Sequence, residues 1–170
     1  MEIPPFLNAL EQSSVSVWLR ETSSIFGFYF VLTGHTIGLS LVVGPNAVVD
    51  LRLLGVARQI PLRPLKQCFR LMWLGLAVNV VTGIFLVVAY PIKAFTNPVF
   101  YLKLTLIFFA VWTMNSLESR VFDDSSLSDA GMVARGKMLA IVSLALWVAV
   151  ITAGRLLAYT CTYLLSGVPC

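Results

Sequence analysis

Charged side chains are scarce in this sequence: Asp, Glu, Lys and Arg make up only 12% of its 170 residues. A typical soluble domain carries about 25%. Hydrophobic residues make up 58%, and the mean hydropathy is +0.88. So few charges cannot keep this much apolar surface in water, which excludes a soluble enzyme and a disordered tail. The net charge of +4 is spread over apolar segments, so nucleic acid is not an expected partner. The composition predicts a membrane protein.

Histidine and cysteine are also rare, with one His and three Cys. No Ser/His/Asp, Cys/His or paired-carboxylate arrangement falls within the apolar segments, and His35 has no acidic residue placed to orient it. We therefore expect no enzyme activity. Three cysteines do not form a disulfide framework. Cys68 is expected to be a free thiol, and the sequence leaves open whether Cys161 and Cys170 pair.

Four apolar segments are long enough to cross a bilayer, which takes about 20 residues of helix. They run over residues 25–49, 71–90, 99–117 and 138–164. Each must be a helix, because unpaired backbone groups are too costly in lipid and no barrel-like alternation is present. The sequence predicts an all-α, four-helix transmembrane bundle that forms a single domain over residues 1–170, with the lipid bilayer as its surroundings.

The segment before the first span predicts a short helix lying in the membrane interface. Residues 14–21 place Val15, Trp18 and Leu19 on one helical face, with two charged residues beside them. A polar lead-in anchored by Trp18 is the alternative. The chain start lacks a basic stretch followed by a short apolar core, so no cleavable signal peptide is expected.

Basic residues predict the orientation, because cytoplasmic loops of membrane proteins are enriched in Lys and Arg. Eight of the twelve basic residues lie in or beside the first and third connections: Arg52, Arg58, Arg63, Lys66, Arg70, Arg120, Arg135 and Lys137. The opposite side holds Arg20, Lys93, Lys103 and Arg155. We expect a multi-pass protein of the bacterial inner membrane with both termini outside the cytoplasm.

Polar side chains within the spans are costly and are therefore functional candidates. They are His35, Asn46, Asn79, Thr82, Asn115, Glu118 and Arg155. From the helical rise, His35 lies roughly 13–15 Å from the outer end of its span, with Thr82 at a similar depth and Asn79 one turn deeper. Asn115 and Glu118 share a face near the inner end of the third span.

His35 lies beside glycines, which permit two interpretations. Gly34 and Gly38 form a small-xxx-small motif that allows close helix approach. The second span has a matching stripe of Gly75, Asn79, Thr82 and Gly83. In the first interpretation the stripes pack against each other, and His35 forms a hydrogen bond with Thr82, with Asn79 or with a backbone carbonyl, which it can only donate to.

The second interpretation is a haem b site. A membrane haem uses one or two imidazole ligands, with glycine against the ring and a cation near the surface for the propionates. His35, Gly34, Gly38 and Arg155 supply these groups at compatible depths. A second imidazole would come from His35 of another copy. Arg155 has an alternative role, in which it reaches the headgroups or pairs with Glu21. A small-molecule or proton pathway also stays open.

Carboxylates near the inner ends of the spans are expected to pair with basic neighbours. We expect Asp50 to pair with Arg52 or Arg120. Glu118 is expected to pair with a basic residue of the third connection, namely Arg120, Arg135 or Lys137. In the same connection residues 123–126 predict a turn, and Ser128 is placed to cap the helix that enters the fourth span.

Longer runs of residues resemble a known group. These runs are Gly34-His35-Thr36-Ile37-Gly38-Leu39, Val42-Val43-Gly44, Asp50-Leu51-Arg52-Leu53-Leu54-Gly55, Lys103 with Asn115, and Ala153-Gly154-Arg155-Leu156 with Tyr159. They resemble an uncharacterised bacterial family of small four-helix integral membrane proteins, defined by a domain of unknown function. A weaker similarity links it to membrane cytochrome b and copper-resistance membrane domains, which generally use several histidines.

Three functions follow as hypotheses. The first is a non-catalytic subunit of a homo-oligomer or of a larger, possibly redox, membrane complex. The second is an electron-transfer protein that binds haem b through His35. The third is an oligomeric channel or transporter, because four helices in one chain seldom enclose a pathway alone.

Overall fold

The computed structural model describes residues 4–21 and 27–159, and the described chain is helical with no strand. The four longest helices are α3 (Phe28–Leu53), α4 (Lys66–Ala89), α6 (Pro98–Leu117) and α7 (Asp129–Tyr159). A 3-10 turn, η1 (Arg63–Leu65), leads into α4, and a π-helical turn, η2 (Glu118–Phe122), ends α6. The resulting spans Phe28–Leu53, Arg63–Ala89, Pro98–Phe122 and Asp129–Tyr159 are long and apolar enough to cross a membrane. The predicted all-α class and four transmembrane helices are confirmed, and the protein is a multi-pass membrane protein.

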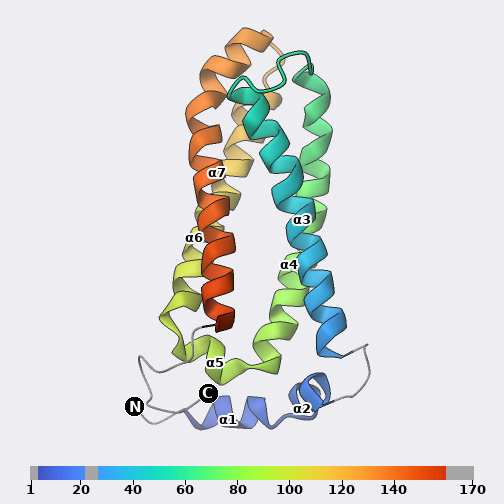
Figure 1. Cartoon of the computed structure of the whole chain (residues 1–170), viewed down its shortest axis with the longest axis vertical. Helices are drawn as coiled ribbons and strands as arrows, with labels where there is room; N and C mark the ends of the chain where they lie inside the picture. Colours follow the sequence, from blue (N-terminus) through green and yellow to red (C-terminus); the bar gives the residue numbers. More distant parts are fainter. Residues whose placement is uncertain (1–3, 22–26, 160–170) are drawn as a thin grey trace.

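The four spans form a bundle whose two ends differ in composition (Figure 1). We call the end with the connections around residues 54–62 and 123–128 the basic end. We call the other end, where α1, α2 and α5 lie, the terminal end. Helices α1 (Pro5–Glu11) and α2 (Ser14–Glu21) lie across the terminal end, next to the short helix α5 (Pro91–Thr96).

Helix α2 has the bounds that the sequence predicts, but only part of its apolar face is buried. Leu19 is buried, whereas Val15 and Trp18 are more than half exposed. The Ser16 hydroxyl donates to the Ala89 carbonyl at 3.3 Å, which ties α2 to the end of α4. Helix α1 was not predicted. It is joined to α2 by an ion pair of 2.9 Å between Arg20 and Glu11.

Several helix boundaries differ from the predicted spans because helical geometry continues beyond the apolar residues; α4, for example, begins at Lys66 rather than near residue 71. Helix α3 extends past residue 49 to Leu53, and α7 begins at Asp129 rather than near residue 138. The Ser128 cap is confirmed: its Oγ accepts from the Gly131 N–H at 3.3 Å. A similar cap precedes α6, where the Asn97 side chain accepts from the Val99 N–H at 2.9 Å.

The spans form two helix pairs, α3 with α4 and α6 with α7, and α3 also contacts α7. Large apolar side chains join the pairs near the basic end, in a cluster of Val49, Leu53, Leu62, Phe69, Met72, Met114, Leu117, Val121, Phe122, Met132 and Ala140. A smaller cluster of Val42, Ala110, Trp147 and Val150 lies toward the middle. The ribbons of the two pairs separate toward the terminal end (Figure 1).

Candidate functional site

The His35 side chain is held between α3 and α4 by the hydroxyl of Thr82. The His35 Nδ1 atom lies 2.9 Å from Thr82 Oγ1, which itself lies 2.7 Å from the Val78 carbonyl oxygen. A hydroxyl has one hydrogen, and the carbonyl can only accept it. Therefore Nδ1 carries the proton and donates to Thr82, and the other nitrogen of the neutral ring, Nε2, keeps its lone pair. Of the three partners that the packing interpretation allows for His35, the structure shows Thr82.

The glycine stripes face each other across the α3–α4 contact. A Cβ atom added to Gly38 would lie 2.7 Å from Asn79 Nδ2 and 3.0 Å from the Gly75 carbonyl oxygen. A Cβ atom on Gly75 would lie 2.7 Å from the Gly38 carbonyl oxygen. At Gly34 the added atom would meet Thr82 at 3.4 Å. Gly34 and Gly38 thus lie against α4, as in the packing interpretation, and the Asn79 amide donates to the Gly75 carbonyl at 3.2 Å.

The cation near His35 is Lys103 of α6 rather than Arg155. Lys103 is half-buried, and it lies within electrostatic range of the His35 imidazole. Its Nζ atom lies 3.8 Å from the position that a Cβ atom of Gly154 would occupy, so the lysine crosses the surface of α7. The Arg155 side chain is exposed. Sequence reasoning missed this arrangement, although Lys103 is the single charged residue between positions 98 and 117.

A second polar cluster joins α3 to α7 nearer the basic end. The Asn46 amide donates to Asp50 Oδ2 within α3 and to Ser143 Oγ of α7, the latter at 2.8 Å. Asn46, Asp50 and Ser143 are each at most 1% exposed. Among the described residues, the second carboxylate oxygen of Asp50 and the indole nitrogen of Trp147 have no hydrogen-bond partner. We refer to Asn46, Asp50 and Ser143 as the Asn46 cluster.

The predicted ion pairs of Asp50 and Glu118 are wrong. Arg52 donates to the carbonyls of Ile60 at 2.6 Å and Arg58 at 3.1 Å, so it braces the first connection instead of contacting Asp50. Glu118 accepts a hydrogen bond of 2.8 Å from the Trp73 indole of α4. The donors to both carboxylates are therefore neutral: Asp50 accepts through one oxygen from Asn46 of its own helix, and Glu118 accepts from an indole that tertiary packing brings to it.

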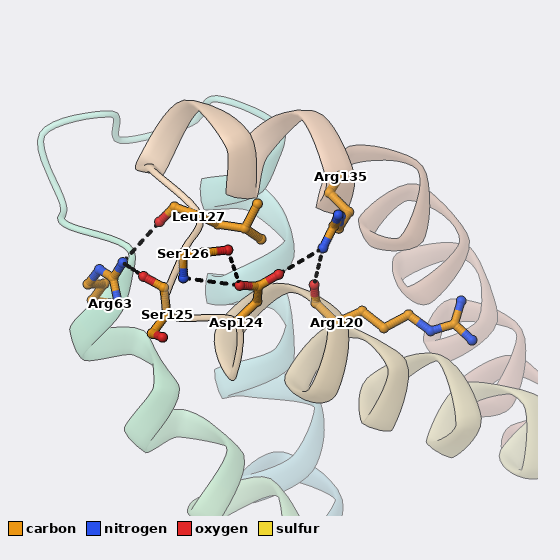
Figure 2. Close-up of polar contacts among 7 residues, drawn as sticks. All are labelled: Arg63, Arg120, Asp124, Ser125, Ser126, Leu127 and Arg135. Atoms are coloured by element: carbon orange, nitrogen blue, oxygen red, sulfur yellow. Dashed lines mark hydrogen bonds and ion pairs between the residues drawn. The ribbon is translucent and has the colours of Figure 1, made fainter.

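The connection from α6 to α7 is held by a network of hydrogen bonds around Asp124 (Figure 2). Ser126 donates to Asp124 through its backbone N–H and its hydroxyl, and Arg135 pairs with the same carboxylate at 3.1 Å. These contacts, the Ser126 hydrogen bonds foremost, hold the pKa of Asp124 below its ordinary value. Arg63 donates to the carbonyls of Ser125 and Leu127 and so joins this connection to the start of α4. The turn predicted over residues 123–126 is thereby stabilised from both sides.

The described residues differ in what they could bind. In residues 4–21 and 27–159 no three His, Cys, Asp or Glu side chains gather in a group that could hold a metal ion. His35 has a free nitrogen lone pair in a half-buried place, and the Asn46 cluster offers a buried carboxylate. Cys68 is a free thiol, whereas Cys161 and Cys170 lie outside the described residues.

Comparison with known proteins identifies a family but no characterised relative. No curated protein and no solved structure matches the chain. One family matches residues 8–160, which include all four spans and every polar site described above. This match agrees with the resemblance to an uncharacterised family. The chain belongs to the family described as "Family of unknown function (DUF6644)".

Proposed function

We propose that the chain is a non-catalytic subunit that associates with a second copy of itself in the membrane. The observation that supports this proposal is the exposed face of α3. Thr33, Thr36, Ser40 and Gly44 follow a spacing of three, four and four residues, so they share one face, and all four are exposed. A Cβ atom added to Gly44 would meet nothing within 4 Å. We call these four residues the α3 stripe.

The α3 stripe has the properties of a helix-association surface in lipid. Lipid tails are as apolar as leucine, so spanning helices associate where small side chains let their backbones come close. The hydroxyls of Thr36 and Ser40 already donate to the carbonyls four residues earlier, both at 3.0 Å. The stripe is therefore small and internally satisfied. The glycines on the opposite side of α3 are occupied by α4, whereas the α3 stripe is open to a partner.

A second copy of the chain fits this surface because a two-fold symmetric contact places the same stripe on both sides. We further propose that the protein resides in the bacterial inner membrane with both termini outside. The basic end carries eight of the twelve Lys and Arg residues and would then face the cytoplasm. A partner of another kind, such as a subunit of a redox complex, is the competing occupant.

Replacing Gly44 with Leu is expected to weaken self-association about tenfold or more, because the larger side chain would hold the two helices apart. The substitution has room within the single chain and should leave its fold intact. Energy transfer between donor- and acceptor-labelled chains in liposomes measures the association. Ala77→Leu, at an exposed position of α4, is the matched control. A wild-type chain that shows no energy transfer at any lipid dilution would contradict the proposal.

A haem b role for His35 is the second candidate, and the fixed Nδ1–H supports it. Metal-bound histidines usually donate their other ring N–H to a neighbouring oxygen, which orients the ligating nitrogen. Thr82 accepts this hydrogen bond here. Lys103 would then be the cation for a propionate, a role that the sequence interpretation gave to Arg155.

The visible spectrum of detergent-purified protein tests the haem proposal. We expect a Soret band that is lost in His35→Ala, weakened in Lys103→Gln and unchanged in Arg155→Gln. The two last variants remove the same charge from a half-buried and an exposed position, so they separate a specific contact from a general effect of charge. Colourless, iron-free protein purified from cells that supply haem would refute the role.

A further inference from the structure

A cavity of about 500 Å³ opens at the basic end between η2 and α7. It is lined by Ser119, Arg120, Asp124, Arg135 and Leu139. The cavity lies where the third span ends and the fourth span approaches the apolar layer. A cavity at this level faces the headgroups of the bilayer rather than its acyl chains.

The cavity carries a positive charge that is unpaired among the described residues. Arg135 is engaged by the Asp124 carboxylate and by the Arg120 carbonyl, at 3.1 and 3.3 Å. No described residue forms a hydrogen bond or ion pair with the guanidinium of Arg120, and Figure 2 shows its side chain extending away from Asp124. Because Asp124 and Arg135 neutralise each other, Arg120 gives the cavity a net charge of one sign. An anion is therefore the ligand that this charge favours.

The side chains next to the cavity extend toward the hydrocarbon layer. Leu139 contributes an apolar wall, and Met138 and Val142 are exposed on the same part of α7. On α6, Asn115 lies one turn deeper than Ser119, about 6 Å along the helix axis. Its side chain is exposed, and none of the described residues hydrogen-bonds to its amide group. An exposed amide near the inner end of a span is open to a polar partner from outside the chain.

We propose that this cavity binds the headgroup of an anionic phospholipid. Arg120 would donate to the phosphate, and Asn115 would donate to an ester carbonyl of the glycerol backbone. This arrangement orders the two donors by depth in the same way as the phosphate and the ester carbonyl are ordered in a phospholipid. A free phosphate would use Arg120 but would leave Asn115 unused. The lipid is therefore the better fit, and the proposal does not depend on self-association of the chain.

Native mass spectrometry of detergent-solubilised protein titrated with phosphatidylglycerol tests the site. We expect one tightly retained lipid per chain, and about tenfold weaker retention in Arg120→Gln, because a charge-assisted hydrogen bond is lost. Lys137→Gln removes the same charge from an exposed residue of the same end that does not line the cavity, and it should bind as the wild type does. Arg120 has no side-chain partner among the described residues, so its replacement should not unfold the chain; circular dichroism checks this.

Further measurements distinguish a bound lipid from a bound free anion. Asn115→Leu should reduce retention of phosphatidylglycerol, and phosphatidylcholine should be retained more weakly than phosphatidylglycerol by the wild type. Millimolar inorganic phosphate should not displace the lipid. Equal retention of both lipids, or equal losses in Arg120→Gln and Lys137→Gln, would overturn the proposal. Displacement by phosphate together with full retention in Asn115→Leu would assign the cavity to a free anion instead.

Discussion

Replacing Asn46 with Leu is expected to lower the free energy of unfolding by about 3 kcal/mol. The substitution keeps a similar volume but removes the amide that donates to both Asp50 and Ser143. All three side chains are buried, so the carboxylate and the hydroxyl would lose a donor without gaining water. Leaving one buried acceptor unsatisfied costs about 1–3 kcal/mol, and more where the group is charged. Reversible unfolding in mixed detergent micelles measures the change.

The double variant Asn46→Leu with Asp50→Leu is the control for this interpretation. Removing both polar partners leaves no buried carboxylate to satisfy, and such paired replacements are often nearly neutral. The double variant should therefore be more stable than Asn46→Leu alone. If the two losses simply add, the Asn46 cluster does not act as a unit, and the stability of the α3–α7 contact comes from its apolar side chains.

Substituting Gly75 by Leu is expected to cost about 3 kcal/mol or more and to separate α3 from α4. A Cβ atom at this position would lie 2.7 Å from the Gly38 carbonyl oxygen and 2.9 Å from the Val42 backbone nitrogen. These are backbone atoms, so the helices themselves must move, and overpacking of a close contact typically costs 1–3 kcal/mol even for smaller insertions. The same unfolding assay reports the loss of stability.

Gly83→Ala provides the matched control on the same helix. Its added atom would lie 3.6 Å from the His35 ring, an ordinary contact distance, and alanine favours a helix over glycine by about 1 kcal/mol. This variant should be as stable as the wild type or more stable. If Gly75→Leu unfolds at the wild-type midpoint, the close approach of the two backbones is not a determinant of stability.

The features that the sequence predicted correctly depend on local patterns along the chain. The four spans follow from runs of apolar residues, and the bounds of α2 and the Ser128 cap follow from a few neighbouring side chains. The contact of His35 with Thr82 was among the alternatives that the sequence allowed, because both residues lie at similar depth on consecutive helices. Consecutive antiparallel helices with matching glycine stripes leave few alternative pairings.

The features that the sequence did not predict depend on the rotation of each helix about its own axis. Lys103 and Arg155 lie at similar depths, but only the rotation of α6 turns Lys103 toward α7. Asn46 donates a hydrogen bond to Ser143, although the two residues are 97 positions apart in the sequence. The indole of Trp73 reaches Glu118 in the same way. Loop composition alone suggested nearby arginines for Asp50 and Glu118, because it carries no information on which faces meet.

The buried core side chains are distributed unevenly along the length of the bundle. The largest fully buried side chains of the described residues all lie in the half that includes the basic end. Packed side chains therefore join the two helix pairs at that end, whereas the halves that carry His35 and Lys103 are joined by the short helix α5. We expect relative motion of the two pairs to be larger around the imidazole than at the connections braced by Arg52 and Arg63.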